Sequence, residues 1–206
     1  MGFFDMATNA AASAVIENRP AGSRYGLDRN HVPPFAQVVP AVLPWSRRLG
    51  GGKNVRVALG AVYCWHEALG LDIWLFFQNQ GGDLGQYLPF PHGRPNTVEG
   101  IEQLPRIGIE FADGRTATNL DYLATPLSSA EPDASTPVLF PGTGGGGGGT
   151  EGYSYMRQHL YLWPVPSDGD ISLIVDWPHR GMSESRTVLN GDEIRSAAAA
   201  AIDVWS

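Results

Sequence analysis

One compact group of polar residues has the composition of a catalytic site. It runs from Asp176 through His179 to Ser183 and continues to Arg186. A carboxylate, an imidazole and a hydroxyl close together could support acid–base catalysis of a hydrolytic reaction. A loop at the end of a strand has the same composition without any catalytic role, because loops are generally polar. A hydrolase built on residues 176–186 is therefore the weakest of the functional hypotheses.

A second group of residues has the chemistry of a binding surface. Aromatic and basic side chains occupy alternate positions of the predicted strand 153–163: Tyr153, Tyr155, Arg157, His159, Tyr161 and Trp163. Side chains alternate between the two faces of a strand, so these residues share one face. Such side chains combine contact area with a polar end, which is typical of protein interfaces and of sugar-binding surfaces. The alternative is that other parts of the same chain cover this face. The candidate interface residues are Tyr153, Tyr155, Arg157, Tyr161 and Trp163.

The glycine tract Gly144–Gly149 is compatible by composition with a dinucleotide-binding loop. Such a loop leads into a helix whose N-terminus meets the pyrophosphate, whereas here an aromatic strand follows. A phosphate-binding loop of the Walker type also requires Gly-Lys-Ser or Gly-Lys-Thr, and neither occurs. The tract is therefore either a connector or a backbone segment packed where no Cβ would fit.

The spacing of potential ligands predicts neither a metal site nor a cofactor. The five histidines are scattered singly, and none forms an H-x-x-x-H pair on a predicted helix. Cys64 is the single cysteine and cannot form an internal disulfide. The G-x-S-x-G motif of α/β-hydrolases is also missing. We therefore predict that the chain is not an enzyme and uses no cofactor.

The charge balance argues against two classes of partner. The 206 residues carry a formal net charge of −7, which disfavours binding to nucleic acid or to an anionic membrane. The N-terminal segment has no basic region of the kind found in signal peptides. No apolar run approaches the ~18 residues of a membrane helix. We expect a cytoplasmic protein.

Short strands are the elements that must position these residues. Alternating or continuous apolar positions predict strands at 35–43, 54–66, 71–78, 107–111, 116–122, 137–140, 153–163, 171–177 and 184–189. Asp113-Gly114 between two of them is a strong hairpin signal. This pattern predicts a mainly β protein, an antiparallel β-sandwich of Ig-like or C2-like form. Its predicted core comprises Val57, Leu59, Ile73, Leu75, Ile109, Phe111, Leu160, Leu173 and Val175.

The two ends of the chain are expected to differ from the sandwich. Residues 191–205 form a predicted C-terminal helix, in which Ile194, Ala198, Ala201 and Trp205 share one stripe. Residues 1–34 are small, polar and interrupted by prolines, which predicts an extended N-terminal arm preceding a domain at 35–206. Such a segment buries too little apolar surface to order by itself. We therefore expect the arm to contact a protein partner or a second copy.

Five strings of the sequence are distinctive: the run Arg106–Asn119, the polyglycine tract, Tyr161-Leu-Trp-Pro-Val-Pro166, Val175-Asp-Trp-Pro178 and the Ala-rich C-terminal segment with Trp205. Together they resemble a family of actinobacterial hypothetical proteins. The resemblance covers residues from about 50 to 206. It implies kinship and no mechanism, so no functional residue is carried over from it.

Two functional hypotheses rank above the hydrolase. The first is a non-catalytic structural or interaction subunit that acts within a homo-oligomer or a larger assembly. It rests on the long arm, the amphiphilic strand and the lack of a catalytic constellation. The alternative is a small-ligand or glycan-binding β-sandwich module in which Tyr155, Tyr161 and Trp163 offer their rings for stacking.

Overall fold

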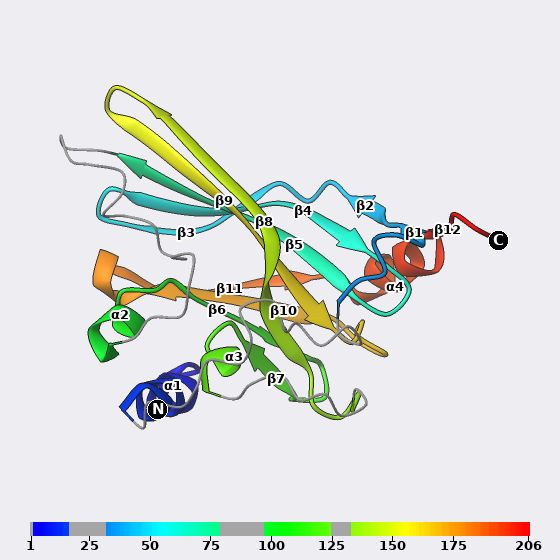
Figure 1. Cartoon of the computed structure of the whole chain (residues 1–206), viewed down its shortest axis with the longest axis horizontal. Coiled ribbons are helices and arrows are strands. Elements are labelled where there is room, and N and C mark those ends of the chain that lie inside the picture. Colours follow the sequence, from blue (N-terminus) through cyan, green and yellow to red (C-terminus); the bar gives the residue numbers. More distant parts are fainter. Residues whose placement is uncertain (1, 17–31, 79–96, 125–132) are drawn as a thin grey trace.

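Two antiparallel β-sheets face each other across the main core (Figure 1). The computed structural model describes residues 2–16, 32–78, 97–124 and 133–206. The loop positions 79–96 and 125–132, and residues 17–31 of the expected arm, lie outside these ranges. The prediction of a mainly β antiparallel sandwich with a C-terminal helix is confirmed.

The larger sheet has the strand order β2-β4-β5-β9-β8, and β3 also pairs with β4. Its strands are β2 (Ala41–Leu43), β3 (Arg47–Gly52), β4 (Val55–Cys64), β5 (Leu69–Gln78), β8 (Val138–Thr150) and β9 (Tyr153–Trp163). β5 pairs with β4 on one side and with β9 on the other. This central position explains why β5 is apolar on both faces near its end.

The smaller sheet has the order β11-β10-β6-β7. Its strands are β6 (Arg106–Glu110), β7 (Thr116–Thr118), β10 (Ile171–Trp177) and β11 (Met182–Leu189). β6 and β7 form the hairpin predicted from Asp113-Gly114, and Gly114 has a φ of 85°. Glycine adopts this left-handed conformation without steric cost.

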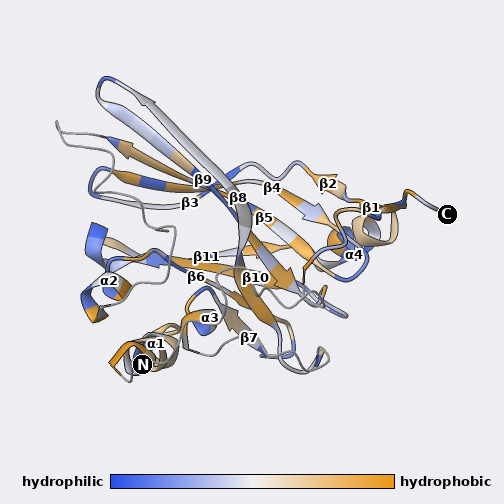
Figure 2. Cartoon of the chain, in the orientation of Figure 1, coloured by the Kyte–Doolittle hydropathy of each residue, from blue (hydrophilic) through white to orange (hydrophobic). Residues whose placement is uncertain are grey.

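The main core lies between the inner faces of the two sheets. Every residue predicted for the core is buried there. Strands β4, β5 and β10 are accordingly hydrophobic over most of their length (Figure 2). The alternation of side chains along each strand therefore fixes which face meets the core.

A short helix stands where the sequence predicted an extended arm. α1 (Asp5–Ile16) packs through Ala11 against a second cluster, to which α2 (Val98–Glu102) and α3 (Asp121–Ala124) contribute. Just before α1, Phe3 and Phe4 lie against Gly108 on the outer face of the smaller sheet. The body of the chain thus holds residues 2–16 in place without a second molecule. The sequence indicates a helix here only weakly, near Ala10–Glu17, because its apolar stripe is weak.

The C-terminal helix is shorter than predicted. α4 (Gly191–Ala199) begins at the cap residue Asn190 and buries Ile194 and Ala198, as expected from the stripe. The predicted extension to residue 205 is wrong, because β12 (Ile202–Asp203) pairs instead with β1 (Val38–Val39). Trp205 is therefore 80% exposed and does not anchor the helix.

Candidate functional site

An exposed aromatic surface lies on the outer face of the larger sheet, where β5 and β9 pair. Phe76 stands opposite Tyr155 and Trp74 stands opposite Arg157. The ring of Trp74 stacks against Phe76 at 5.9 Å between centroids and against Tyr155 at 5.5 Å. Large parts of Phe76, Tyr153 and Tyr155 remain accessible, at 41%, 62% and 40% exposure. We call Trp74, Phe76, Tyr153 and Tyr155 the aromatic face.

A buried carboxylate holds the aromatic face in position. Asp72 Oδ1 accepts a hydrogen bond from Arg157 Nε at 2.6 Å, and its Oδ2 accepts one from Trp74 Nε1 at 2.9 Å. The guanidinium of Arg157 also lies over the Trp74 ring, 5.4 Å from its centroid. The hydrogen bond to Asp72 raises the pKa of Arg157. One carboxylate thus fixes both the tryptophan and the arginine, which limits the entropy that this surface loses on binding.

Glycines on the neighbouring strands β8 and β4 make room for aromatic rings on the outer side of the larger sheet. A Cβ at Gly148 of β8 would lie 3.2 Å from the ring of Tyr155, and one at Gly142 would lie 2.4 Å from the ring of Tyr161. On β4, a Cβ at Gly60 would come within 2.6 Å of Trp74 Nε1. The glycine tract is therefore part of a strand, and its neighbour Gly142 is packed under an aromatic ring. Of the two interpretations of the tract, the connector is thus wrong, because residues 145–150 pair with β9 as a strand.

The remaining predicted interface residues are covered by the chain itself. Tyr161 and Trp163 are only 6% and 8% exposed. Tyr161 belongs to a third cluster with Trp65 and Phe140, and Phe35 packs over it with 5.3 Å between ring centroids. Burial raises the pKa of Tyr161. Of the predicted residues, Tyr153, Tyr155 and Arg157 stay at the outer surface.

Sequence reasoning missed Trp74 and Phe76. Both lie on β5, whose second half is apolar on both faces, and such a pattern by itself indicates only a central position in the sheet. The signal was nevertheless present, because the outer face of this strand carries Asp72, Trp74 and Phe76 at alternate positions. The pairing of β5 with β9 then brings them beside Tyr155 and Arg157.

The polar residues of the 176–186 segment serve different roles. Asp176 forms an ion pair with Arg106, on the side of the smaller sheet that α1 covers. Burial raises the pKa of Asp176, and the hydrogen bond to Arg106 opposes this effect. His179 and Ser183 are exposed, and neither hydrogen-bonds a carboxylate within the described part of the chain. The structure therefore does not bring the three predicted residues together.

The described residues hold no group of three or more His, Cys, Asp or Glu side chains that could bind a metal ion. Cys64 is buried in the main core, and burial raises the pKa of its thiol to about 12. A thiol with this pKa is protonated at neutral pH and is a poor nucleophile. Across the described ranges, no helix has the length and apolarity required to span a membrane.

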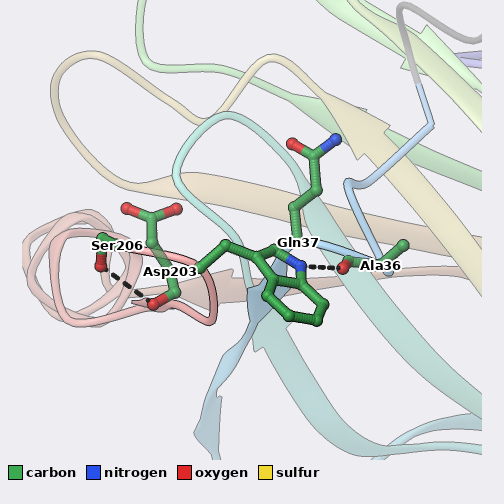
Figure 3. Close-up of a pocket in the computed structure, with 5 residues that line it drawn as sticks. Ala36, Gln37, Asp203 and Ser206 are labelled. Carbon is green, nitrogen blue, oxygen red and sulfur yellow. Dashed lines mark hydrogen bonds between the residues drawn. The ribbon is translucent and has the colours of Figure 1, made fainter.

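One open pocket lies near the C-terminus (Figure 3). Trp205 donates from Nε1 to the Ala36 carbonyl at 2.9 Å, and Ser206 Oγ donates to the Asp203 carbonyl at 3.1 Å. The single carboxylate of the pocket, Asp203, lies 3.5 Å from His66 Nε2. These contacts fasten the C-terminal segment to the loop that carries Ala36.

The aromatic face thus combines exposed rings with a tryptophan held by a buried carboxylate. Comparison of the chain with protein-family models, with curated proteins and with solved structures found no match, so the resemblance to the actinobacterial family stays a prediction.

Proposed function

We propose that this protein is a non-catalytic interaction subunit that binds a protein partner through the aromatic face. The observation that carries the proposal is the exposed set of stacked rings on β5 and β9, ordered from beneath by Asp72. Tyrosine, tryptophan and arginine are the residues most often found at the energetic centre of protein interfaces. Here Tyr155, Trp74 and Arg157 lie together on one sheet face.

The exposed rings offer apolar area that a partner can cover. Burying one large apolar side chain contributes about 1.5–3 kcal/mol, and Phe76, Tyr153 and Tyr155 all retain large exposed fractions. Because the rings already stack on one another, little side-chain freedom is lost when a partner covers them. A partner of matching shape therefore gains contact area at low entropic cost.

The ring geometry favours a protein partner over a glycan. Trp74 lies nearly parallel to Phe76 and Tyr155, with interplanar angles of 13° and 28°. The faces of the Trp74 ring are therefore directed toward neighbouring rings. A sugar stacks on an open ring face, so this arrangement disfavours a glycan. Two of the three rings expected to stack on a sugar, Tyr161 and Trp163, are buried.

The proposed contact surface differs from the N-terminal arm that the sequence predicts. Residues 2–16 pack on the body of the chain, which supports the aromatic face as the surface left for a partner. Association through the arm remains the alternative. The cytoplasmic location expected from the sequence is part of this proposal, and fractionation of native cells tests it.

The test is capture of partners from a native lysate by three forms of the full chain. In the test variant, Phe76→Ser and Tyr155→Ser are combined. In the control variant, Val188→Ser changes a 58% exposed residue on β11 in the smaller sheet. We expect wild type and control to retain the same partner and the double variant to lose it. Equal capture by all three folded forms would contradict the proposal.

A further inference from the structure

Among the described residues, no strand pairs with the outer side of the glycine half of β8. β8 stands at the end of the strand order, with β9 on its inner side. Residues 145–150 pair with β9 without interruption, after a bulge between Pro141 and Gly145. Figure 1 shows this half of β8 projecting with β9 toward the upper left, away from α3 and β7. We call the outer side of residues 145–150 the glycine edge.

The glycine edge offers backbone groups that a further strand can bind. In an antiparallel pair, alternate residues direct their N–H and C=O groups away from the partner strand. About three of the six residues of the glycine edge therefore present a free donor and a free acceptor. Proteins usually block such edges with lysine, proline or inward charges, and none of these occurs from Gly144 to Thr150.

The other terminal strands of the two sheets are protected. Pro40 and Pro44 flank β2, so the strand is short and its extension is blocked. β7 has only three residues. β11 carries Glu184 and Arg186, whose side chains are engaged in ion pairs. β3 also borders the larger sheet beside β4, and β11 hydrogen-bonds to it. Among the described edge strands of the two main sheets, the glycine edge is the exception.

We propose that the glycine edge pairs with the same edge of a second copy, antiparallel and about a two-fold axis. This inference rests on the proposed function as an interaction subunit and identifies one of its partners. A foreign strand is normally selected by pockets for its side chains, and a row of glycines offers none on the edge strand itself. Two glycine edges approach each other without side-chain clashes, and pairing of identical surfaces closes at a dimer.

The length of the glycine edge defines the register of this pairing. With the axis at Gly147, Gly145 of one copy lies opposite Gly149 of the other, and about six backbone hydrogen bonds form. The turn at residues 151–152 then falls beside the bulge of the other copy. Val138–Pro141, which continues β8 beyond the bulge, therefore stays outside the pairing.

Such a dimer would join the two aromatic faces. Tyr155 leans over β8, since a Cβ at Gly148 would lie 3.4 Å from its hydroxyl. Pairing of the two β8 strands therefore places one Tyr155 on each side of the paired glycine edges. The result is a single continuous sheet with one extended binding surface.

Gly146 allows a clean test, because a Cβ there meets nothing within 4 Å. The full chain is compared with Gly146→Lys, Gly146→Glu and the control Gly146→Ala by sedimentation velocity over a range of concentrations. We expect wild type and the alanine control to dimerise with equal affinity. The lysine and glutamate variants should each dimerise about fivefold more weakly, because the two like charges become diagonal neighbours across the strand pair, within reach of each other.

An equimolar mixture of the lysine and glutamate variants should recover dimerisation, because opposite charges then meet. A monomeric wild type, or charged variants that dimerise as wild type does, would overturn the inference. A monomer that still captures its partner through the aromatic face would leave the proposed function intact. A further outcome is that the Phe76→Ser and Tyr155→Ser double variant loses dimerisation while both charged variants keep it. This would place the dimer contact on the aromatic face and overturn the inference that the glycine edge forms it.

Discussion

Asp72 and Arg157 form a diagonal cross-strand ion pair, in which the aspartate is almost fully buried and the arginine is partly exposed. The same carboxylate also binds Trp74, so its removal affects both groups. Asp72→Ala should lower the free energy of unfolding by about 1–3 kcal/mol, because two donors lose their acceptor. Arg157 can reach water, which keeps the loss below that of a fully buried pair. Chemical denaturation measures the change.

Asp72→Asn is the matched control, since it keeps an acceptor without the charge. It should retain part of the stability and part of the order of Trp74, observed by near-ultraviolet circular dichroism. An alanine variant as stable as wild type, with an unchanged spectrum, would show that Asp72 does not order the aromatic face.

Phe4, just before α1, and Met6, within α1, differ strongly in burial and provide a test of how the N-terminal segment docks. Phe4 is 2% exposed, whereas Met6 is 72% exposed. Phe4→Ala should destabilise the protein by about 3–5 kcal/mol through loss of buried surface and formation of a cavity. Met6→Ala should change the free energy of unfolding by less than about 0.5 kcal/mol. Equal denaturation midpoints for the two variants would contradict the docking of the N-terminal segment.

Two glycines near each other on β8 should respond in opposite ways to alanine. A Cβ at Gly142 would lie 2.4 Å from the Tyr161 ring, but one at Gly146 has open space. Gly142→Ala should cost about 1–3 kcal/mol through overpacking. Gly146→Ala should be neutral or should stabilise by up to about 1 kcal/mol, because it restricts the unfolded chain. The prediction fails if thermal unfolding shows the same shift for both.

Because the Cys64 thiol is buried, we expect the protein to lose stability in alkaline solution. Burial raises its pKa from an ordinary value of 9.0 to about 12. Since the unfolded thiol ionises first, the stabilising contribution is complete below pH 9.0 and declines as the pH rises toward 12. The slope attributable to this group is about 1.4 kcal/mol per pH unit.

Comparison with Cys64→Ala isolates this contribution, because the other titrating groups are common to both proteins. The alanine variant should be less stable at pH 7, and its stability should fall less steeply between pH 9 and pH 11. Parallel stability curves for the two proteins would indicate that the thiol is not buried in solution.

The sequence predicts the sandwich well because strand alternation is a local property. Val57 and Leu59 alternate with polar or small neighbours, and this pattern alone assigns them to the core. The extent of the C-terminal helix depends instead on a distant strand. Residues 202–203 pair with Val38–Val39, and this pairing replaces the helical turn that the local pattern favoured.

The candidate site was only partly predictable for the same reason. Tyr155 and Tyr161 have the same local pattern on β9, but Phe35 covers only Tyr161. Which tyrosine stays exposed is thus decided by a segment more than a hundred positions away along the chain. Phe76 and Trp74 join the site through strand pairing, which the sequence pattern does not specify.

The position of α1 also has a consequence for biosynthesis. α1 leaves the ribosome before β6 and β10, but Phe4 and Thr8 contact Arg106, and Arg106 is paired to Asp176 on β10. The surface that receives α1 is therefore incomplete until most of the chain has been translated. During that interval Phe3 and Phe4 have no docking site, and a nascent chain that exposes apolar residues is prone to aggregate. α1 is thus made before the surface on which it docks, and chaperone binding to residues 2–16 would shield them during this delay.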